Sequence, residues 1–312
     1  MPGLAGPDDT VHYRVFYPAE FTGSDHERLS GEIPLDPSFG SLPVVLILPG
    51  MNIGPEGYRW LAEHLAAAGC AVVTYALIEE TRPGVVGISP GLDLDALTPH
   101  TYRSRPSATA IGPILGSLAA LDADGILADA LDLDRVVLGG HSAGGTVALL
   151  NADPGWFPGV VAVWSFAAHT MASTMLGWDA ESVLPTPSAV PTLLLAAGND
   201  GVIARSADRY GRAAGPDHDP IARTFAEGLE HGSGDQRYAV VDGALHTSLL
   251  HPHDPTSARG FLDGEPGRDP AAIRGELAGA IGDFVSAYGL GEQGATDKLD
   301  LRLSGWPRFE RA

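Results

Sequence analysis

Ser142 is the residue of this chain whose surroundings most clearly predict chemistry. It occupies the centre of Gly140–Gly144 (Gly-His-Ser-Ala-Gly), between the apolar run Val136–Leu138 and the helix-like segment Thr146–Leu150. A Gly-x-Ser-x-Gly sequence between a strand and a helix is typical of a nucleophile elbow, a turn so tight that the serine backbone is strained. The glycines leave room for the neighbouring chain, and the free N–H groups that begin the helix favour negative charge. The sequence therefore predicts a nucleophilic serine above the edge of a sheet.

A second copy of the same pattern, Gly87–Gly91 (Gly-Ile-Ser-Pro-Gly), is centred on Ser89. It is followed by Leu92–Asp95 and further loop signals instead of a helical pattern. Pro90 has no N–H, whereas the residue after a nucleophile must donate one to the developing oxyanion. Context and chemistry both exclude Ser89 as the nucleophile.

A serine hydroxyl needs a base to remove its proton, and that base is commonly a histidine oriented by a carboxylate. The carboxyl ends of the strands of a doubly wound sheet meet at one edge, so the partners are sought directly after strands. Asp200 follows the predicted strand 192–197, and His246 follows the predicted strand 237–241. The chain order Ser142, Asp200, His246 is the order expected for a triad on such a sheet.

Both partner positions have rivals. Asp242 stands close to His246 and could orient it, while Asp200 could instead be a residue that stabilises a turn. Three further histidines lie near enough in the sequence to compete with His246: His231, His251 and His253. The segment His251–Asp254 (His-Pro-His-Asp) contains metal-ligand residue types but lacks partner ligands at a recognisable spacing, so we predict no metal site.

The oxyanion of an acyl transfer needs two hydrogen-bond donors. In a nucleophile elbow one donor is the N–H of the residue after the serine, here Ala143, and the other comes from the loop after the first central strand. That loop, residues 48–52, contains Gly50, which permits a sharp turn, and Met51, whose N–H is placed to donate. We therefore predict an oxyanion hole formed by Met51 and Ala143.

The elements that must position these residues alternate between strands and helices. The predicted strands cover residues 44–48, 70–77, 135–138, 160–166, 192–197 and 237–241, preceded by two antiparallel strands over 11–17 and 28–35. The predicted helices cover residues 56–68, 107–121 and 271–288. Such alternation, with continuous apolar runs in the strands, predicts an α/β fold with a doubly wound, mostly parallel sheet and helices on both faces.

The 312 residues are enough for one large domain. We predict a single domain over residues 1–290 and a polar C-terminal tail over residues 291–312. Two stretches rich in Gly, Pro and Asp exceed normal connections and are interpreted as insertions near residues 79–105 and 211–235. We expect the insertions to narrow the cleft above the sheet.

Composition argues against several classes of partner. Lys and Arg number 19 against 39 Asp and Glu, and the net charge of −20 argues against nucleic acid as a partner. No apolar run is long enough for a membrane helix, and the first residues lack the segments of a signal peptide, so we expect a cytoplasmic protein. Cys70 is the single cysteine, so an intrachain disulfide is excluded and a buried, inert thiol is expected.

Two stretches of the sequence resemble a known family. Pro43–Tyr58, which contains Leu-Pro-Gly-Met-Asn, and Gly139–Gly145 are similar to the chlorophyllase, dienelactone hydrolase and bacterial cutinase-like polyester hydrolase group of serine esterases. The resemblance extends over about residues 44–288. It implies an α/β-hydrolase fold and hydrolysis of carboxylic esters through an acyl-enzyme, without a cofactor. The chain departs from dienelactone hydrolases proper, which use a cysteine where Ser142 stands.

The resemblance leaves the substrate open between small-molecule and polymeric esters. The same scaffold can also carry an amidase, a lactonase or a thioesterase, and a non-catalytic binding module is a further alternative. The side chains expected to shape the pocket follow strands at the catalytic edge: Asn52, His141, Trp164, Phe166 and His169. This partly aromatic wall suits an uncharged, fairly apolar ester, although Trp164 and Phe166 could equally be core residues and His169 a loop residue.

Overall fold

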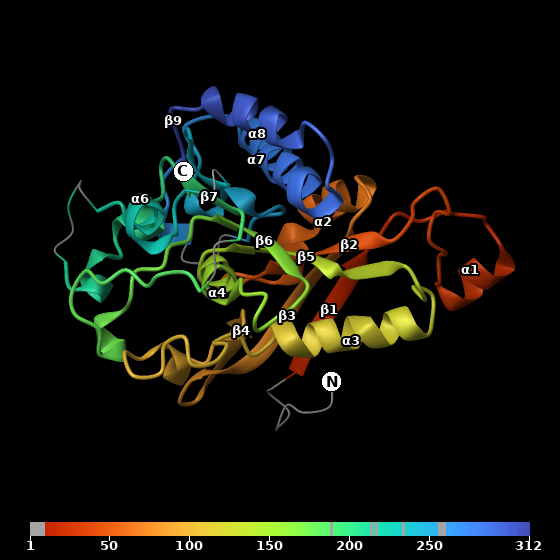
Figure 1. The fold of residues 1–312 in the computed structure, drawn as a ribbon, viewed down its shortest axis with the longest axis horizontal. Coiled ribbons are helices and arrows are strands. Elements are labelled where there is room, and N and C mark those ends of the chain that lie inside the picture. Colours follow the sequence, from red (N-terminus) through yellow and green to blue (C-terminus); the bar gives the residue numbers. More distant parts are fainter. Residues whose placement is uncertain (1–9, 188–189, 213–214, 216–217, 233–234, 255–259) are drawn as a thin grey trace.

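A nine-stranded mixed sheet forms the centre of the described part of the chain (Figure 1). The computed structural model describes residues 10–187, 190–212, 215, 218–232, 235–254 and 260–312. Residues 1–9, on which the expected lack of a signal peptide depends, and parts of the predicted insertion 211–235 lie outside the described residues. The strands are β1 (Thr10–Phe16), β2 (Leu42–Leu48), β3 (Ala71–Arg82), β4 (Val85–Ser89), β5 (Leu131–His141), β6 (Val160–Phe166), β7 (Thr192–Ala197), β8 (Gln236–Val241) and β9 (Arg308–Arg311).

The strand order is β1-β3-β2-β5-β6-β7-β8-β9, and β4 pairs with β3. From β3 to β8 in this order neighbouring strands are parallel, whereas β1, β4 and β9 are antiparallel to their partners. Parallel strands that are covered on both faces need continuous apolar runs, and every residue of β2 is buried. The predicted α/β fold with a mostly parallel sheet is confirmed.

Helices cover both faces of the sheet. Successive residues of a strand point to opposite faces, so each face has apolar side chains for helices to pack against. Val44 and Leu46 belong to a core that contains residues of α3 and α4, whereas Val45 and Ile47 belong to a second core with α2, α7 and α8. In Figure 1, α2, α7 and α8 lie together towards the top of the view and α3 lies at the bottom. The helices are α1 (Asp25–Ser30), α2 (Arg59–Ala67), α3 (Ile111–Ala123), α4 (Ala143–Asn151), α5 (Gly201–Ala204), α6 (Pro220–Arg223), α7 (Pro270–Val285) and α8 (Ala295–Ser304).

The predicted strand over residues 28–35 is wrong. Its first residues belong to α1, in which the side chain of Ser24 accepts a hydrogen bond from the N–H of Glu27 and Gly31 ends the helix in the left-handed conformation. None of the helix residues is buried, so this segment lacks the covered face that a strand of the central sheet has. The serine cap and the glycine were the correct signals in this segment.

The first predicted insertion, residues 79–105, begins as part of the sheet. Strand β3 continues to Arg82, and β4 folds back on it as an antiparallel hairpin through Pro83 and Gly84. Gly84 has a positive φ of 75°, which a tight turn of this kind requires. The Pro-Gly pair that suggested a loop therefore marks a hairpin turn.

The predicted C-terminal tail, residues 291–312, contains α8 and β9. Strand β9 pairs antiparallel with β8, so the end of the chain forms one edge of the sheet. Trp306 and Phe309 pack against the core that contains α7 and α8. The mostly polar sequence concealed this role because a short edge strand needs few apolar residues.

Within the described residues no helix combines the length and the apolar character needed to cross a membrane. Cys70 is free and buried, and burial, followed by the charge of Glu292, raises the pKa of its thiol to about 12. An almost fully protonated thiol is a poor nucleophile, which agrees with the expected inert cysteine.

Candidate active site

The carboxyl ends of four parallel strands bring the predicted site residues to one edge of the sheet. Ser142 follows β5, the loop that contains Met51 follows β2, Asp200 follows β7 and His246 follows β8. Because these strands are neighbours or near neighbours in the sheet, residues more than a hundred positions apart in the sequence meet above it.

The backbone of Ser142 is strained. Its φ of 54° and ψ of −125° lie outside the regions that side chains usually allow, and such a residue costs on the order of 1–3 kcal/mol. The turn is held by close backbone approaches: a Cβ atom on Gly140 would lie 2.4 Å from the carbonyl oxygen of Gly144, and one on Gly144 would lie 2.2 Å from that of Leu48. Only glycine fits at these two positions, as expected from the motif.

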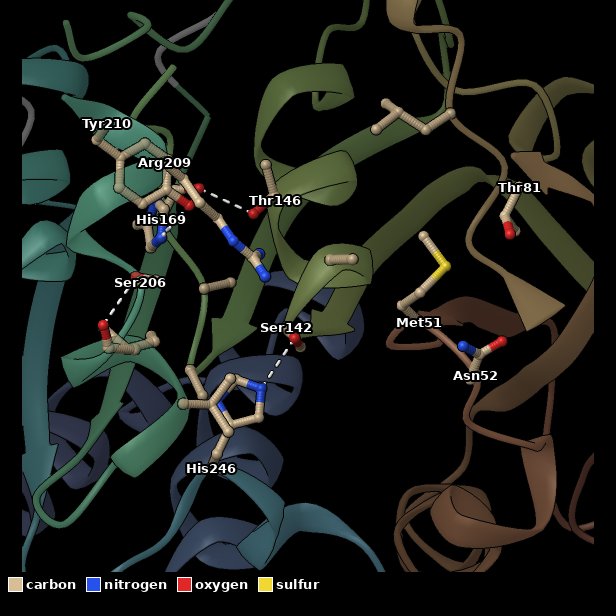
Figure 2. Close-up of a pocket in the computed structure, with 16 residues that line it drawn as sticks. Met51, Asn52, Thr81, Ser142, Thr146, His169, Ser206, Arg209, Tyr210 and His246 are labelled. Carbon is tan, nitrogen blue, oxygen red and sulfur yellow. Dashed lines mark hydrogen bonds between the residues drawn. The ribbon is translucent and has the colours of Figure 1, made fainter. Parts of the chain in front are cut away.

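Ser142, His246 and Asp200 form one hydrogen-bonded chain. The Nδ1 atom of His246 lies 2.8 Å from Oδ2 of Asp200. Its Nε2 atom lies 2.9 Å from Oγ of Ser142, the bond drawn in Figure 2. A carboxylate can only accept, so Nδ1 carries the proton and donates a hydrogen bond to Asp200. The unprotonated Nε2 then accepts from the Ser142 hydroxyl, which is the arrangement that a general base requires.

Asp200 has two roles at once. Its Oδ1 accepts from the N–H of Ile203, 2.7 Å away, and so caps α5, while its Oδ2 reaches His246. The rival carboxylate Asp242 is exposed, and so are the three rival histidines His231, His251 and His253. The capping bond fixes the carboxylate that faces His246, so the turn-residue interpretation and the orienting role are compatible.

Ser89, at the centre of the second Gly-x-Ser-x-Gly sequence, is buried at the end of β4. Its hydroxyl oxygen accepts from the N–H of Gly91 at 2.9 Å. No histidine is hydrogen-bonded to it among the described residues. This serine has a structural role in the turn after the hairpin.

Two backbone N–H groups beside Ser142 have no acceptor within the described part of the chain. On either side of Met51, the N–H of Gly50 donates to the Tyr58 hydroxyl at 2.9 Å and that of Asn52 donates to the carbonyl of Ile88 at 2.7 Å. The N–H groups of Met51 and Ala143 make no such bond, and both residues line the cavity above Ser142. They are free to donate to an oxyanion that forms there.

His141 was predicted to contact substrate, but it is fully buried and lies outside the cavity lining. Its Nε2 atom lies 2.8 Å from the carbonyl oxygen of His246, and its Nδ1 atom lies 3.1 Å from the Tyr58 hydroxyl. A carbonyl only accepts, so Nε2 carries the proton and Tyr58 donates to Nδ1. Burial, and then the neighbouring His246, hold the pKa of His141 well below its usual value, so this histidine is neutral.

Trp164 and Phe166 also lie outside the cavity lining, contrary to the prediction that they form its wall. Both are fully buried in the core that contains α2 and α7. They are two positions apart in β6 and therefore point to the same face of the sheet, into that core. The alternative interpretation as core residues is the correct one.

The cavity above Ser142 has a volume of about 570 Å³. Of the predicted substrate-contacting residues, Asn52 and His169 line it. Several lining residues were not predicted from the sequence: Thr81, Thr146, Ser206, Arg209 and Tyr210. The last three belong to a short turn shortly after Asp200, and their proximity to that residue along the chain was the available signal.

His169 supports one wall of the cavity. Its Nδ1 atom accepts from the N–H of Met171 at 3.2 Å, so Nε2 carries the proton and donates to the Tyr210 hydroxyl at 3.2 Å. Burial, followed by the charges of His218, His246 and Arg209, lowers the pKa of His169 to about 3. A neutral His169 is thus a structural donor rather than a second base.

Among the described residues, no group of three or more His, Cys, Asp or Glu side chains is arranged to hold a metal ion. A comparison of the chain with protein-family models and with curated protein sequences finds no match in either.

Proposed function

We propose that this chain is an α/β-hydrolase-fold serine esterase that hydrolyses carboxylic esters through a Ser142-His246-Asp200 triad. The observation that carries the proposal is the hydrogen-bonded chain from Asp200 through His246 to Ser142, beside the two unbonded N–H groups of Met51 and Ala143. The strained backbone of Ser142 supports it, because strain of this kind clusters at functional sites.

In the first half-reaction, Oγ of Ser142 attacks the ester carbonyl carbon while Nε2 of His246 takes the hydroxyl proton. The N–H groups of Met51 and Ala143 stabilise the negative oxygen of the tetrahedral intermediate. His246 then gives its proton to the departing alkoxide, which leaves as the alcohol, and the acyl group remains on Ser142. Asp200 stabilises the imidazolium that exists between these two transfers.

In the second half-reaction, a water molecule replaces the alcohol. His246 takes a proton from the water as its oxygen attacks the acyl carbon, and the same two N–H groups stabilise the second tetrahedral intermediate. The intermediate collapses, His246 returns the proton to Oγ of Ser142, and the carboxylic acid leaves. The two halves consume one water and regenerate the enzyme.

Hydrolysis of p-nitrophenyl butyrate by the purified protein tests the proposal. The Ser142→Ala variant should lose about 10⁴-fold or more in kcat, as triad deletions do. Ser89→Ala is the matched control, because it removes the serine of the second Gly-x-Ser-x-Gly sequence and should retain turnover. Activity of Ser142→Ala within about tenfold of the unmodified protein would refute the assignment. The corresponding p-nitroanilide separates ester from amide hydrolysis.

A further inference from the structure

The cavity above Ser142 has one charged wall. In Figure 2, Arg209 and Tyr210 lie on the side opposite Met51 and Asn52, and the Arg209 side chain extends towards the part of the cavity where Ser142 lies. We infer that the ester hydrolysed at this site carries a carboxylate group, which Arg209 binds while the ester carbonyl lies at Ser142. This inference rests on the proposed function and names its substrate class.

Arg209 is a cation without an ion-pair partner among the residues that the structure describes. The residues that line the cavity include no Asp and no Glu. Within the described chain no carboxylate forms an ion pair with Arg209, whereas its close neighbour Arg212 pairs with Glu181. Most other described arginines have such a partner, and Arg103, Arg205 and Arg274 do not. Unlike those three arginines, Arg209 lines the cavity above Ser142. In a protein with a net charge of −20, an arginine in a cavity whose lining has no carboxylate indicates an external anion.

The turn that carries Arg209 is held in place by buried side chains and hydrogen bonds. Arg209 belongs to a single 3-10 turn, Ala207–Tyr210, in which Ala207 and Tyr210 are buried. The Tyr210 hydroxyl receives a hydrogen bond from His169, and the Thr174 hydroxyl donates to the carbonyl of Arg209 at 3.3 Å. The guanidinium group therefore projects from a fixed backbone, which reduces the conformational entropy lost when it binds an anion.

The number of donors favours a carboxylate over a phosphate. A guanidinium binds a carboxylate through two parallel N–H···O bonds and matches its single negative charge. His169 is neutral and donates to Tyr210, so it adds no second charge. Apolar groups of Ala167, Ala168 and Ile203 line the same cavity and suit a short methylene chain between the carboxylate and the ester.

This substrate differs from the uncharged ester expected from the sequence. That expectation depended on an aromatic wall of Trp164 and Phe166, and both residues are buried in the core. Arg209 follows no strand and belongs to no motif, so its proximity to Asp200 along the chain was the one signal for it. A half-ester of a dicarboxylic acid has the chemistry that the cavity can recognise.

Matched pairs of ethyl esters test the inference. In each pair a carboxylate replaces the terminal methyl group: monoethyl succinate against ethyl butyrate, monoethyl glutarate against ethyl valerate, and monoethyl adipate against ethyl hexanoate. The measured quantity is kcat/KM from released ethanol. For the pair that fits the distance from Ser142 to Arg209, the half-ester should be preferred by about tenfold, the effect expected of one charge-assisted contact.

Three variants assign the preference to Arg209. In Arg209→Gln the ratio of the two kcat/KM values should fall about tenfold, and Arg209→Lys, which keeps the charge but not the planar fork, should restore part of it. Arg205→Gln is the matched control: it removes the same charge from an exposed residue four positions away that does not line the cavity. A preference that survives Arg209→Gln, or that Arg205→Gln abolishes equally, would overturn the inference.

Turnover of the neutral esters separates the two proposals. If the protein hydrolyses them without preferring any half-ester, the proposed function stands and the carboxylate site is wrong. If it hydrolyses no ester, ligand-observed NMR of monoethyl glutarate and ethyl valerate with Ser142→Ala protein still tests the carboxylate site. Binding of the half-ester that is about tenfold tighter, and lost in Ser142→Ala/Arg209→Gln, supports the site without catalysis, whereas equal binding overturns it.

Discussion

At the scale of single residues, a chain of hydrogen bonds joins three of the four segments that carry the site, those that follow β2, β5 and β8. It runs from the N–H of Gly50 to the Tyr58 hydroxyl, from Tyr58 to Nδ1 of His141, and from Nε2 of His141 to the carbonyl of His246. Every member is buried, so each bond is protected from competition with water. In the proposed site, His141 and Tyr58 are positioning residues that set the distance between the loop that contains Met51 and His246.

Replacing Tyr58 with Phe tests this role. The change leaves two buried polar groups without a partner, the N–H of Gly50 and Nδ1 of His141, and should cost about 2–4 kcal/mol of the free energy of unfolding. It should also lower kcat about tenfold with little change in KM, because the loops shift relative to each other. Urea unfolding and ester kinetics measure the two effects.

Tyr13→Phe is the control for Tyr58→Phe. Tyr13 also shares one hydroxyl hydrogen bond with a side chain, Ser117, at 2.6 Å, but it lies on β1, away from the site. This variant should lose stability without losing kcat. If both variants lowered kcat in proportion to their loss of stability, the positioning role would be wrong.

The two buried histidines predict a pH dependence of stability. Burial keeps His141 and His169 neutral in the folded protein, whereas in the unfolded chain each takes up a proton below about pH 6.5. The unfolded state then binds more protons, so the free energy of unfolding falls with decreasing pH by about 1.4 kcal/mol per pH unit for each histidine. For His169 the loss continues down to its folded pKa of about 3.

Denaturant unfolding between pH 7.5 and 5 measures this slope. The groups that face His169 are His218, His246, Arg209 and Tyr210. His169→Gln should reduce the slope below pH 6.5 by about 1.4 kcal/mol per pH unit. His12→Gln, which replaces an exposed histidine on β1, is the matched control. An unchanged slope in His169→Gln would show that His169 already binds a proton in the folded state.

The proximity of residues in space could be predicted from the sequence where a motif and a strand end coincide. Ser142, Asp200 and His246 each follow an apolar run, and the structure brings these three together. The direction of a side chain within a strand could not be predicted in the same way, and His141 was therefore assigned to the cavity. One position along a strand reverses the face to which a residue points.

At the scale of elements, the β3–β4 hairpin holds the loop that contains Met51, one of the two proposed oxyanion donors. The N–H of Asn52 donates to the carbonyl of Ile88 at 2.7 Å, and Oδ1 of Asn52 accepts from the N–H of Ile88 at 3.2 Å. Gly87 permits this approach, because a Cβ atom there would lie 2.5 Å from Oδ1 of Asn52. Asn52 itself has a positive φ of 59°, a conformation that asparagine tolerates better than most residues.

Asn52→Ala should therefore weaken both the fold and catalysis. It removes the hydrogen bond from the N–H of Ile88 to the Asn52 side chain and places alanine, which tolerates a positive φ less well than asparagine, at this position. The expected cost is about 1–2 kcal/mol of unfolding free energy. We expect kcat to fall about tenfold as the N–H of Met51 moves. Asn52→Gly separates the causes, because it tolerates the φ and lacks the bond. Equal kcat in all three proteins would contradict a role for the hairpin in holding this loop.

Elements buried on both faces were predicted closely from the sequence. The predicted strands 160–166 and 192–197 coincide with β6 and β7, because their continuous apolar runs have one stable place in a covered parallel sheet. The hairpin of β3 and β4 was missed because most residues of β4 are at least partly exposed. In addition, β4 pairs with the end of β3, which extends beyond the part of β3 that pairs with β2. Periodicity weakens where only part of a strand is covered.

At the scale of the whole molecule, the C-terminal segment closes one edge of the sheet. Arg237 on β8 is fully buried, and its Nε donates to Oδ1 of Asp300 on α8 at 2.6 Å. Its Nη1 donates to the Tyr288 hydroxyl at 2.8 Å. From the sequence this segment was predicted to be a polar tail. The contact that binds it to the sheet could not be predicted, because Asp300 pairs with Arg237, more than sixty positions earlier in the chain.

Removing the partner of a buried charge predicts a large loss of stability. Asp300→Ala leaves Arg237 without its carboxylate and should lower the free energy of unfolding by about 3 kcal/mol. Asp297→Ala, an exposed aspartate on the same helix, is the control and should change stability by no more than about 0.5 kcal/mol. Similar unfolding free energies for the two variants would mean that the segment contributes little to the fold.

Covalent labelling of Ser142 is the most direct test of the central claim, that this serine is an activated nucleophile. The protein is treated with a fluorophosphonate probe and the modified peptide is identified by mass spectrometry. One adduct should form, on Ser142, and it should be absent from Ser142→Ala and much slower to form in His246→Ala, which lacks the base. An unlabelled protein, or an adduct on another serine such as Ser89, would contradict the account.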